Sequence, residues 1–287
     1  MIVSEKASVS VVIPCFNSSK TILRALESLY NQTVLVSEII CIDDSSCDDT
    51  VKIIEEYSNV HPDLNVKVFK NSVNAGPSTS RNFGWNTASS DYIAFLDSDN
   101  AWHPRKIELQ YGWMLQHTDV DLSGHAPPFT KTEPDDCNSL TPAKSKLNLL
   151  TEIESEKLSK SDLLNMNPFE TSSVMLKRNI PHRFDVNKRY CEDYLLWMQI
   201  IFDNHEIYRL SALLTFVYQT PNSLSSNRWK MRVGDIDNYV YLWRVGKINI
   251  LDMLIRAVYS LLKFILMIVS PQIHLFLREK IKQGSTL

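Results

Sequence analysis

Two aspartates separated by a single residue, Asp97 and Asp99, follow a short apolar run and are the first candidates for chemistry. Two carboxylates spaced in this way just past a buried strand can hold a hard divalent cation in an oxygen shell. Such an ion bridges the oxygens of a diphosphate and neutralises charge as the leaving group departs. Because an Asp-x-Asp triplet is also common in solvated turns, the surrounding residues have to decide between the two interpretations.

Two further groups of polar residues favour the metal site. Asp43 and Asp44 end another apolar run, where a carboxylate can accept hydrogen bonds from a nucleobase or a ribose. The alternative is a cap for the next helix, and one of the two can serve only that purpose. Arg81 follows the string Asn74-Ala75-Gly76, and a guanidinium clamps a phosphate or stacks on a base. A surface salt bridge is the alternative for Arg81.

The elements that must position these residues are short β-branched strands alternating with amphipathic helices. This alternation predicts an α/β fold with a parallel, doubly wound sheet and right-handed crossovers. Ligands of such sheets bind beyond the carboxyl ends of the strands, where Asp43-Asp44 and Asp97-Ser98-Asp99 fall. The expected strands are Val9–Ile13, Glu38–Ile42, Val66–Phe69 and Tyr92–Leu96, and the expected helices begin at Ser18 or Ser19 (apolar face Ile22, Leu26, Leu29 and Tyr30), at Asp48-Asp49-Thr50 and near Thr79.

The second half of the chain is less regular. Residues 127–146 hold several prolines and many polar residues, which predicts a long loop. Glu192–Phe202 predicts a helix with a broad buried face, whereas Ile207–Leu210 and Leu213–Tyr218 predict strands.

The composition of the chain limits which binding partners and which cellular compartment we expect. The net charge of −3 offers no global attraction for nucleic acid, so no nucleic-acid partner is expected. The five cysteines are odd in number and form no Cys-x-x-Cys pair, which favours reduced thiols over disulfides or a zinc site. The first residues lack the basic and apolar regions of a signal peptide, so we expect a cytoplasmic protein.

Five strings of the sequence stand out together: Val9-Ser10-Val11-Val12-Ile13-Pro14-Cys15-Phe16-Asn17, Ile42-Asp43-Asp44-Ser45-Ser46, Asn74-Ala75-Gly76 with Ser80-Arg81-Asn82, Phe95-Leu96-Asp97-Ser98-Asp99 with Trp102-His103-Pro104, and Cys191-Glu192-Asp193-Tyr194. Their order and spacing are similar to those of family 2 glycosyltransferases, which have the GT-A fold. The resemblance implies a Rossmann-like, mixed but mainly parallel sheet flanked by helices. Two positions depart from the family pattern, since Ser80 stands where Ala is frequent and Asn100 where a third carboxylate is frequent.

The resemblance also implies a reaction and a role for each matched residue. A sugar would pass from a nucleotide-diphosphate donor, often UDP, to an acceptor hydroxyl with inversion at the anomeric carbon. Asp193 would be the general base and take the proton as the new bond forms, because a carboxylate is too weak to ionise an alcohol beforehand. Asp99 would bind Mn²⁺ or Mg²⁺ directly, with Asp97 beside the metal or the ribose. The donor nucleotide would contact Pro14, Phe16, Asn17, Asp43, Asp44, Arg81, Asp97 and Ser98, and Glu192 and Trp102 would shape the acceptor pocket.

Three segments follow from this resemblance. Residues 1–118 are expected to form the nucleotide-sugar half and residues 119–245 the acceptor half of one GT-A domain, followed by a helical extension at residues 246–287. The expected function lies in the assembly of a bacterial O-antigen, capsule or exopolysaccharide, on a glycan or lipid-linked glycan acceptor. The alternative is a non-catalytic nucleotide-sugar or carbohydrate-binding protein on the same scaffold.

The extension is predicted to lie on a membrane. Ile250–Val269 is very apolar but carries a polar stripe, and burying that stripe in lipid would cost several kcal/mol. A helix lying flat in the interface satisfies both faces, so we expect peripheral association with the inner face of the cell membrane. Packing of this helix against protein is the alternative. The stripe consists of Asp252, Arg256, Tyr259, Ser260 and Lys263, and the basic residues that follow it are Arg278, Lys280 and Lys282.

Overall fold

The computed structural model describes residues 6–125, 153–218 and 227–269. The chain forms two compact units, of which the first comprises residues 1–187 and 196–221 and the second residues 188–195 and 222–287. The loop predicted at residues 127–146 and the basic residues beyond 270 lie outside the described residues.

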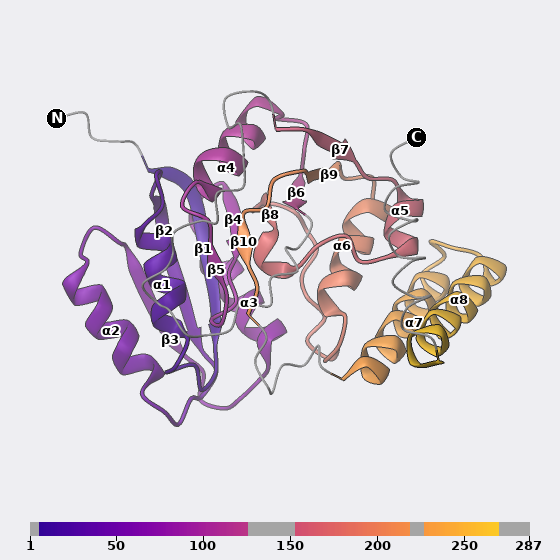
Figure 1. Ribbon diagram of the computed structural model, residues 1–287, viewed down its shortest axis with the longest axis horizontal. Helices are drawn as coiled ribbons and strands as arrows, with labels where there is room; N and C mark the ends of the chain where they lie inside the picture. Colours follow the sequence, from indigo (N-terminus) through magenta and orange to yellow (C-terminus); the bar gives the residue numbers. More distant parts are fainter. Residues whose placement is uncertain (1–5, 126–152, 219–226, 270–287) are drawn as a thin grey trace. The chain divides into compact units, whose positions relative to one another are not determined.

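An eight-stranded sheet forms the centre of the first unit (Figure 1), in the order β3-β2-β1-β4-β8-β6-β9-β7. The first four strands of this order are parallel, β6 and β9 are parallel to each other, and β8 and β7 run against their neighbours. The predicted α/β fold with a mixed, mainly parallel sheet is therefore confirmed. The strands are β1 (Ala7–Cys15), β2 (Val36–Asp43), β3 (Val66–Lys70), β4 (Tyr92–Phe95), β6 (Leu122–His125), β7 (Ser155–Lys157), β8 (Met175–Lys177) and β9 (Ile207–Leu210), and a separate antiparallel pair is formed by β5 (Ala101–Trp102) and β10 (Thr215–Phe216).

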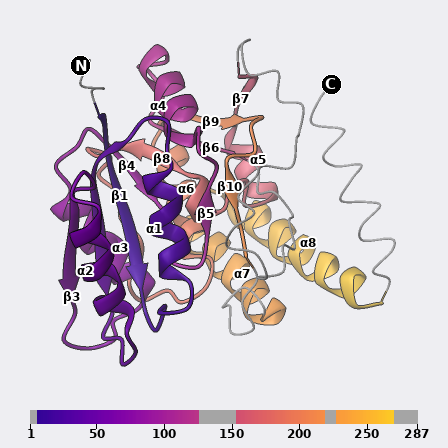
Figure 2. The ribbon, with the colours of Figure 1, turned by 60° about the vertical axis from the view of Figure 1, so that its left-hand side comes forward.

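Helices pack on both faces of the parallel strands. Successive side chains of a buried strand point to opposite faces of the sheet, so the apolar residues on each face contact helices. Val11 and Ile13 of β1 join the apolar cluster that includes residues of α1, α2 and α4, and Figure 2 shows α1 and α2 beside the first three strands. Val12 faces α3, where a Cβ added to Gly84 would lie 2.4 Å from Val12 Cγ1. Glycine therefore lets α3 approach the strand closely. The helices are α1 (Ile22–Tyr30), α2 (Thr50–Val60), α3 (Pro77–Thr87), α4 (Lys106–Gln116) and α5 (Lys160–Asn165), and the 3₁₀ turn η1 (Thr171–Ser173) precedes β8.

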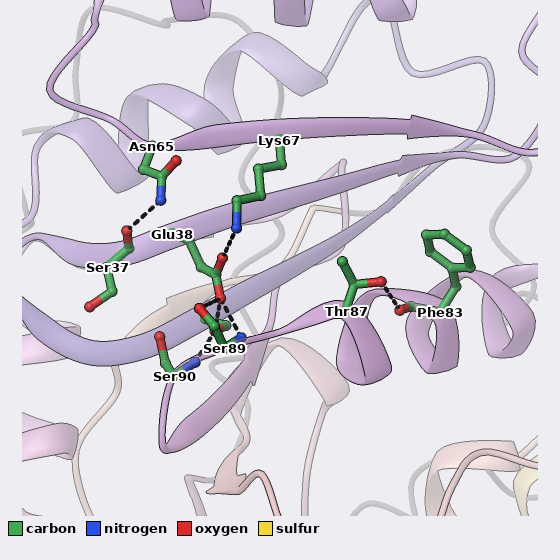
Figure 3. A network of polar contacts seen from close by, with 9 residues as sticks. Ser37, Glu38, Asn65, Lys67, Phe83, Thr87, Ser89 and Ser90 are labelled. Carbon is green, nitrogen blue, oxygen red and sulfur yellow. Dashed lines mark hydrogen bonds and ion pairs between the residues drawn. The ribbon is translucent and has the colours of Figure 1, made fainter.

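A buried carboxylate ties β2 to three neighbouring segments (Figure 3). Glu38 is 1% exposed and accepts hydrogen bonds from Ser10 Oγ at 2.6 Å, Ser89 N at 2.7 Å and Lys67 Nζ at 2.5 Å. Burial by itself raises the pKa of Glu38, but the hydrogen bonds from Lys67, Ser10 and Ser89 outweigh it and lower the pKa to about 2. The side chain is therefore ionised at neutral pH and joins β1, β3 and the loop before β4.

In the second unit, the helices α7 (Arg228–Arg244) and α8 (Ile250–Val269) pack side by side (Figures 1 and 2). The polar stripe of α8 turns partly toward α7, since Ser260 is 3% exposed and the charge of Lys263 acts on Asp235 of α7. Among the described helices none is both long enough and apolar enough to cross a bilayer. The outward side of α8 is apolar, and its exposed residues include Ile250, Leu251, Leu254, Ile255, Val258, Leu262, Ile265 and Val269.

Three local predictions are wrong. The residue that precedes α1 is Thr21 rather than Ser18 or Ser19, and the backbone carbonyl of Ser18 accepts from Thr21 N while its hydroxyl is used elsewhere. Tyr30 is 43% exposed, because its ring lies 4.3 Å from that of His61 at the surface instead of joining the apolar face of α1. The strand expected at Leu213–Tyr218 shortens to β10, since its partner β5 has only two residues.

Candidate active site

The carboxyl ends of β1, β2 and β4 bring three loops together at one edge of the sheet. Asn17, which follows β1 with a left-handed φ of 49°, donates its backbone N–H to Ser46 Oγ at 2.9 Å. The hydroxyls of Ser18 and Ser98 lie 2.8 Å apart and join the first loop to the turn after β4. The structure thus brings the predicted donor residues Asn17 and Ser98 to the same edge, as the geometry of parallel strands requires.

The carboxylate of Asp44 stabilises a neighbouring loop through hydrogen bonds. Its Oδ1 accepts from Asn71 Nδ2 at 2.7 Å and Ala75 N at 2.9 Å, and its Oδ2 accepts from Gly76 N at 2.7 Å. These bonds fix the loop at Gly76, whose φ of 86° suits glycine, before Pro77 begins α3. The carboxylate therefore shapes this edge of the sheet from inside the protein.

Asp43 differs from Asp44, because one of its two carboxylate oxygens has no hydrogen-bond partner among the described residues. It is 3% exposed, and its Oδ2 accepts a 3.2 Å hydrogen bond from Ser46 N. Its Oδ1 is buried and has no hydrogen-bond partner among the described residues. Because a buried polar atom without a partner costs free energy, a ligand that donates a hydrogen bond is the natural complement of this oxygen. Of the two aspartates, Asp43 is the better candidate for direct contact with a nucleoside.

Arg81 holds the first carboxylate of the triplet. It is 6% exposed and donates from Nη2 to Asp97 Oδ1 at 2.8 Å, while its guanidinium lies 5.3 Å from the Phe184 ring. This pair is not the surface salt bridge that the sequence left open as an alternative. Arg81 therefore sets the direction of the Asp97 carboxylate, which is half-buried.

Ser172 of η1 supports the same turn and was missed by the sequence analysis. Its hydroxyl accepts from Asp97 N and from Asn100 Nδ2, each at 3.0 Å. Its carbonyl accepts from Trp102 Nε1 at 2.8 Å, and Trp102 is only 1% exposed. The indole is thus packed behind the turn, and the role predicted for Trp102 in shaping the acceptor pocket stays a prediction. Asn100, where a carboxylate was expected in many relatives, uses its amide N–H₂ as a donor, which a carboxylate lacks.

The turn fits a divalent cation that takes most of its ligands from the substrate. Asp97 and Asp99 are both half-buried directly after β4. No group of three or more His, Cys, Asp or Glu side chains suited to a metal ion occurs in the part of the chain that the structure describes. Mg²⁺ is usually held by one or two carboxylates together with phosphate oxygens and water, and two carboxylates meet that requirement.

The remaining predicted residues fall into two places. Pro14 and Phe16 stand at the carboxyl end of β1, at the same edge of the sheet as Asp43 and Asp97, with Phe16 50% exposed. Glu192 and Asp193 form the first turn of α6 (Glu192–Phe202) and belong to the second unit, where Asp193 Oδ1 accepts from Tyr194 N at 2.7 Å. The approach of Asp193 to Asp99 stays a prediction.

Solved structures of other proteins share this architecture. TarS residues 1–349 of S. aureus match with a TM-score of 0.63 and 20% identity, over 93% of this chain and 73% of that one. The mannosyltransferase PcManGT of Pyrobaculum calidifontis, solved with GDP-Man and Mn²⁺, matches with a TM-score of 0.63 and 14% identity, over 99% of this chain and 82% of that one. These likenesses show the GT-A fold.

Comparison of the amino-acid sequence identifies the family to which the chain belongs, in addition to the fold. The model of glycosyl transferase family 2 matches residues 10–186, and the chain belongs to this family. WfgD of Escherichia coli, a UDP-Glc:alpha-D-GlcNAc-diphosphoundecaprenol beta-1,3-glucosyltransferase, is 29% identical over 223 residues, which cover 77% of this chain and 81% of that protein. The predicted family and the predicted enzyme class, a glycosyltransferase, are therefore confirmed.

Proposed function

We propose that the enzyme transfers a sugar from a UDP-linked donor to a hydroxyl of a lipid-linked glycan during the assembly of a surface polysaccharide, with inversion at the anomeric carbon. The observation that carries this proposal is the unpartnered buried oxygen of Asp43 at the sheet edge that also bears the Asp97–Asp99 turn. A nucleoside has N–H and O–H groups that can donate a hydrogen bond to the Asp43 oxygen. Its diphosphate has oxygens that can bind a cation held at the Asp97–Asp99 turn. The activity of WfgD, which uses a UDP-Glc donor and a diphosphoundecaprenol-linked acceptor, supports both substrate classes.

Asp99, assisted by Asp97, is proposed to bind Mn²⁺ or Mg²⁺. When bound, the cation neutralises the charge that develops on the departing diphosphate. Arg81 and Ser172 keep Asp97 in place through its carboxylate and its backbone N–H. The Mn²⁺ in the PcManGT structure supports this choice of ion.

Asp193 is proposed as the general base and Glu192 as a residue of the acceptor site. The acceptor oxygen forms a bond to the anomeric carbon from the face opposite the diphosphate, while the bond to the diphosphate breaks. Asp193 takes the hydroxyl proton in the same step, because proton transfer is favourable only once the new bond is forming. Residues 1–118 would then serve mainly the donor and residues 119–245 mainly the acceptor.

Donor turnover and binding test this proposal. Purified protein is screened against nucleotide-sugars, with Mn²⁺ or with a chelator, for thermal stabilisation and for donor hydrolysis. We expect stabilisation by UDP-sugars only with metal, loss of turnover in Asp99→Ala and Asp193→Ala, and loss of UDP binding in Asp43→Asn. Near-normal turnover of Asp193→Ala would show that another group is the base. Binding without any turnover in the wild type, with lipid-linked acceptors supplied, would favour the non-catalytic alternative.

The outward face of α8 is proposed to lie on the inner face of the cell membrane. Leu251, Leu254, Val258 and Leu262 are each at least half exposed, and an apolar face of this kind suits a membrane interface. We expect the protein to float with vesicles that contain anionic lipid, and Leu254→Gln/Val258→Gln to lose flotation while keeping donor hydrolysis. A wild type that stays unbound but self-associates through this face would contradict membrane docking.

A further inference from the structure

Arg24 reaches from α1 to the turn that carries Asp99. One of its Nη atoms donates a hydrogen bond to the backbone carbonyl of Asp99. The guanidinium also lies 3.6 Å from the centroid of the Tyr218 ring, just beyond β10. Tyr218 is itself tied to the turn, because its backbone N–H donates to Asn100 Oδ1 at 3.2 Å. One side chain on α1 therefore holds two segments that are far apart in the sequence.

The electrostatic situation of Arg24 differs from that of Arg81. Arg81 is paired with the carboxylate of Asp97, whereas no carboxylate pairs with Arg24 among the described residues. The Nε of Arg24 is buried and has no hydrogen-bond partner in the same part of the chain. A buried donor left unpaired costs free energy. The guanidinium of Arg24 therefore lies at the turn despite this cost in free energy. Among the described residues, its partners are the carbonyl of Asp99 and the ring of Tyr218.

We infer that Arg24 is a positioning residue for Asp99, an inference that rests on the proposed role of Asp99 in metal binding. Arg81 and Ser172 fix the first residue of the turn, Asp97. Arg24 fixes the main chain at the other carboxylate, Asp99, and keeps Tyr218 stacked against the turn. The separation of the two carboxylates, on which a shared cation depends, is therefore set by anchors at both residues.

The test measures metal binding directly. The readout is the Mn²⁺ concentration that gives half of the maximal thermal stabilisation by UDP, followed by the same measurement for donor hydrolysis. Arg24→Met keeps most of the volume but loses both contacts, and we expect that concentration to rise roughly tenfold, the effect of one charge-assisted hydrogen bond. Arg24→Lys is expected to restore little, because an ammonium does not stack and donate in the fixed geometry of a guanidinium. Near-complete rescue by Arg24→Lys would overturn positioning, since charge alone would then account for the effect.

Tyr218 provides an independent check. Tyr218→Phe keeps the ring and is expected to resemble the wild type, whereas Tyr218→Leu is expected to shift the Mn²⁺ concentration in the same direction as Arg24→Met. If the two residues act through one stack, the double variant Arg24→Met/Tyr218→Leu is less impaired than the two single effects predict together. Independent, additive effects would overturn the shared role of the stack.

Arg183 is a matched control. It stacks 4.2 Å over the Trp85 ring, donates to the carbonyls of Ile180 and His182 at 2.7 Å each, and donates from Nε to Asn86 Oδ1 at 2.8 Å. Arg183 thus combines an aromatic ring with backbone carbonyls, as Arg24 does, but makes none of these contacts with the Asp97–Asn100 turn. Arg183→Met is expected to lower the melting temperature and leave the Mn²⁺ concentration unchanged. If Arg24→Met behaves in the same way, Arg24 is merely structural and the proposed function still stands. If the wild type shows no metal-dependent stabilisation by any nucleotide, the proposed function fails and the inference fails with it.

Discussion

Replacing Glu38 with glutamine is expected to destabilise the fold by about 3 kcal/mol at neutral pH. The carboxylate has a folded pKa of about 2 against an ordinary value of 4.5. Each pKa unit corresponds to about 1.4 kcal/mol, and the side chain is only 2% exposed, so solvent screens little of this difference. Glutamine keeps the size of the side chain but, like a protonated carboxyl, cannot accept the bonds from Lys67, Ser10 and Ser89 with a full negative charge.

The pH dependence gives the sharper assay. Because the folded pKa lies below the unfolded one, the contribution of Glu38 is complete above about pH 4.5 and is lost as the pH falls toward about 2. Urea denaturation of the wild type and of Glu38→Gln, from neutral pH down to about pH 3, measures the difference in unfolding free energy. We expect this difference to shrink steadily once the pH falls below about 4.5.

A matched control separates this effect from general acid sensitivity. Glu55 pairs with Lys70 at 3.4 Å, and both side chains are more than half exposed. Glu55→Gln is expected to change stability by less than about 1 kcal/mol at every pH. The reasoning about Glu38 is refuted if wild type and Glu38→Gln lose stability in parallel on acidification, or if the two glutamine variants behave alike.

Three other substitutions probe the fold and the candidate site. Gly84→Ala puts a methyl group 2.4 Å from Val12 Cγ1, and a cost of about 1–3 kcal/mol is expected in urea denaturation; an unchanged midpoint would contradict the close approach of α3. Ser172→Ala removes the hydroxyl that accepts from Asp97 N, and we expect a several-fold higher donor KM with about 1–2 kcal/mol of lost stability. Kinetics identical to the wild type would show that this bond does not position Asp97. Asp44→Ala leaves the N–H groups that it now binds without an acceptor, and thermal melts are expected to report a loss of about 3 kcal/mol. A stable Asp44→Ala with lost UDP binding would instead exchange the roles assigned to the two adjacent aspartates.

Local patterns in the sequence were sufficient for the four parallel strands β1 to β4 and for the edge of the sheet at which the candidate site lies. The β-branched runs before Asp43 and Asp97 end in carboxylates, and parallel strands place their carboxyl ends at one edge, so a shared site follows without coordinates. The antiparallel strands β7 and β8 were not predicted, because three residues are too few to show a period. The apolar stripe of α8 predicted an amphipathic helix, but only α7 decides which side of it is covered.

The partners of the polar groups were decided by the tertiary structure alone. Sequence treats Asp43 and Asp44 alike, yet the loop at Gly76 satisfies one of them and leaves an oxygen of the other unpaired. Asp97 N and Ser172 Oγ are 75 residues apart, and Arg24 meets the carbonyl of Asp99 across the same separation. Periodicity records which side a residue faces, whereas hydrogen bonds between distant residues depend on distances and directions that exist only once the whole unit has packed.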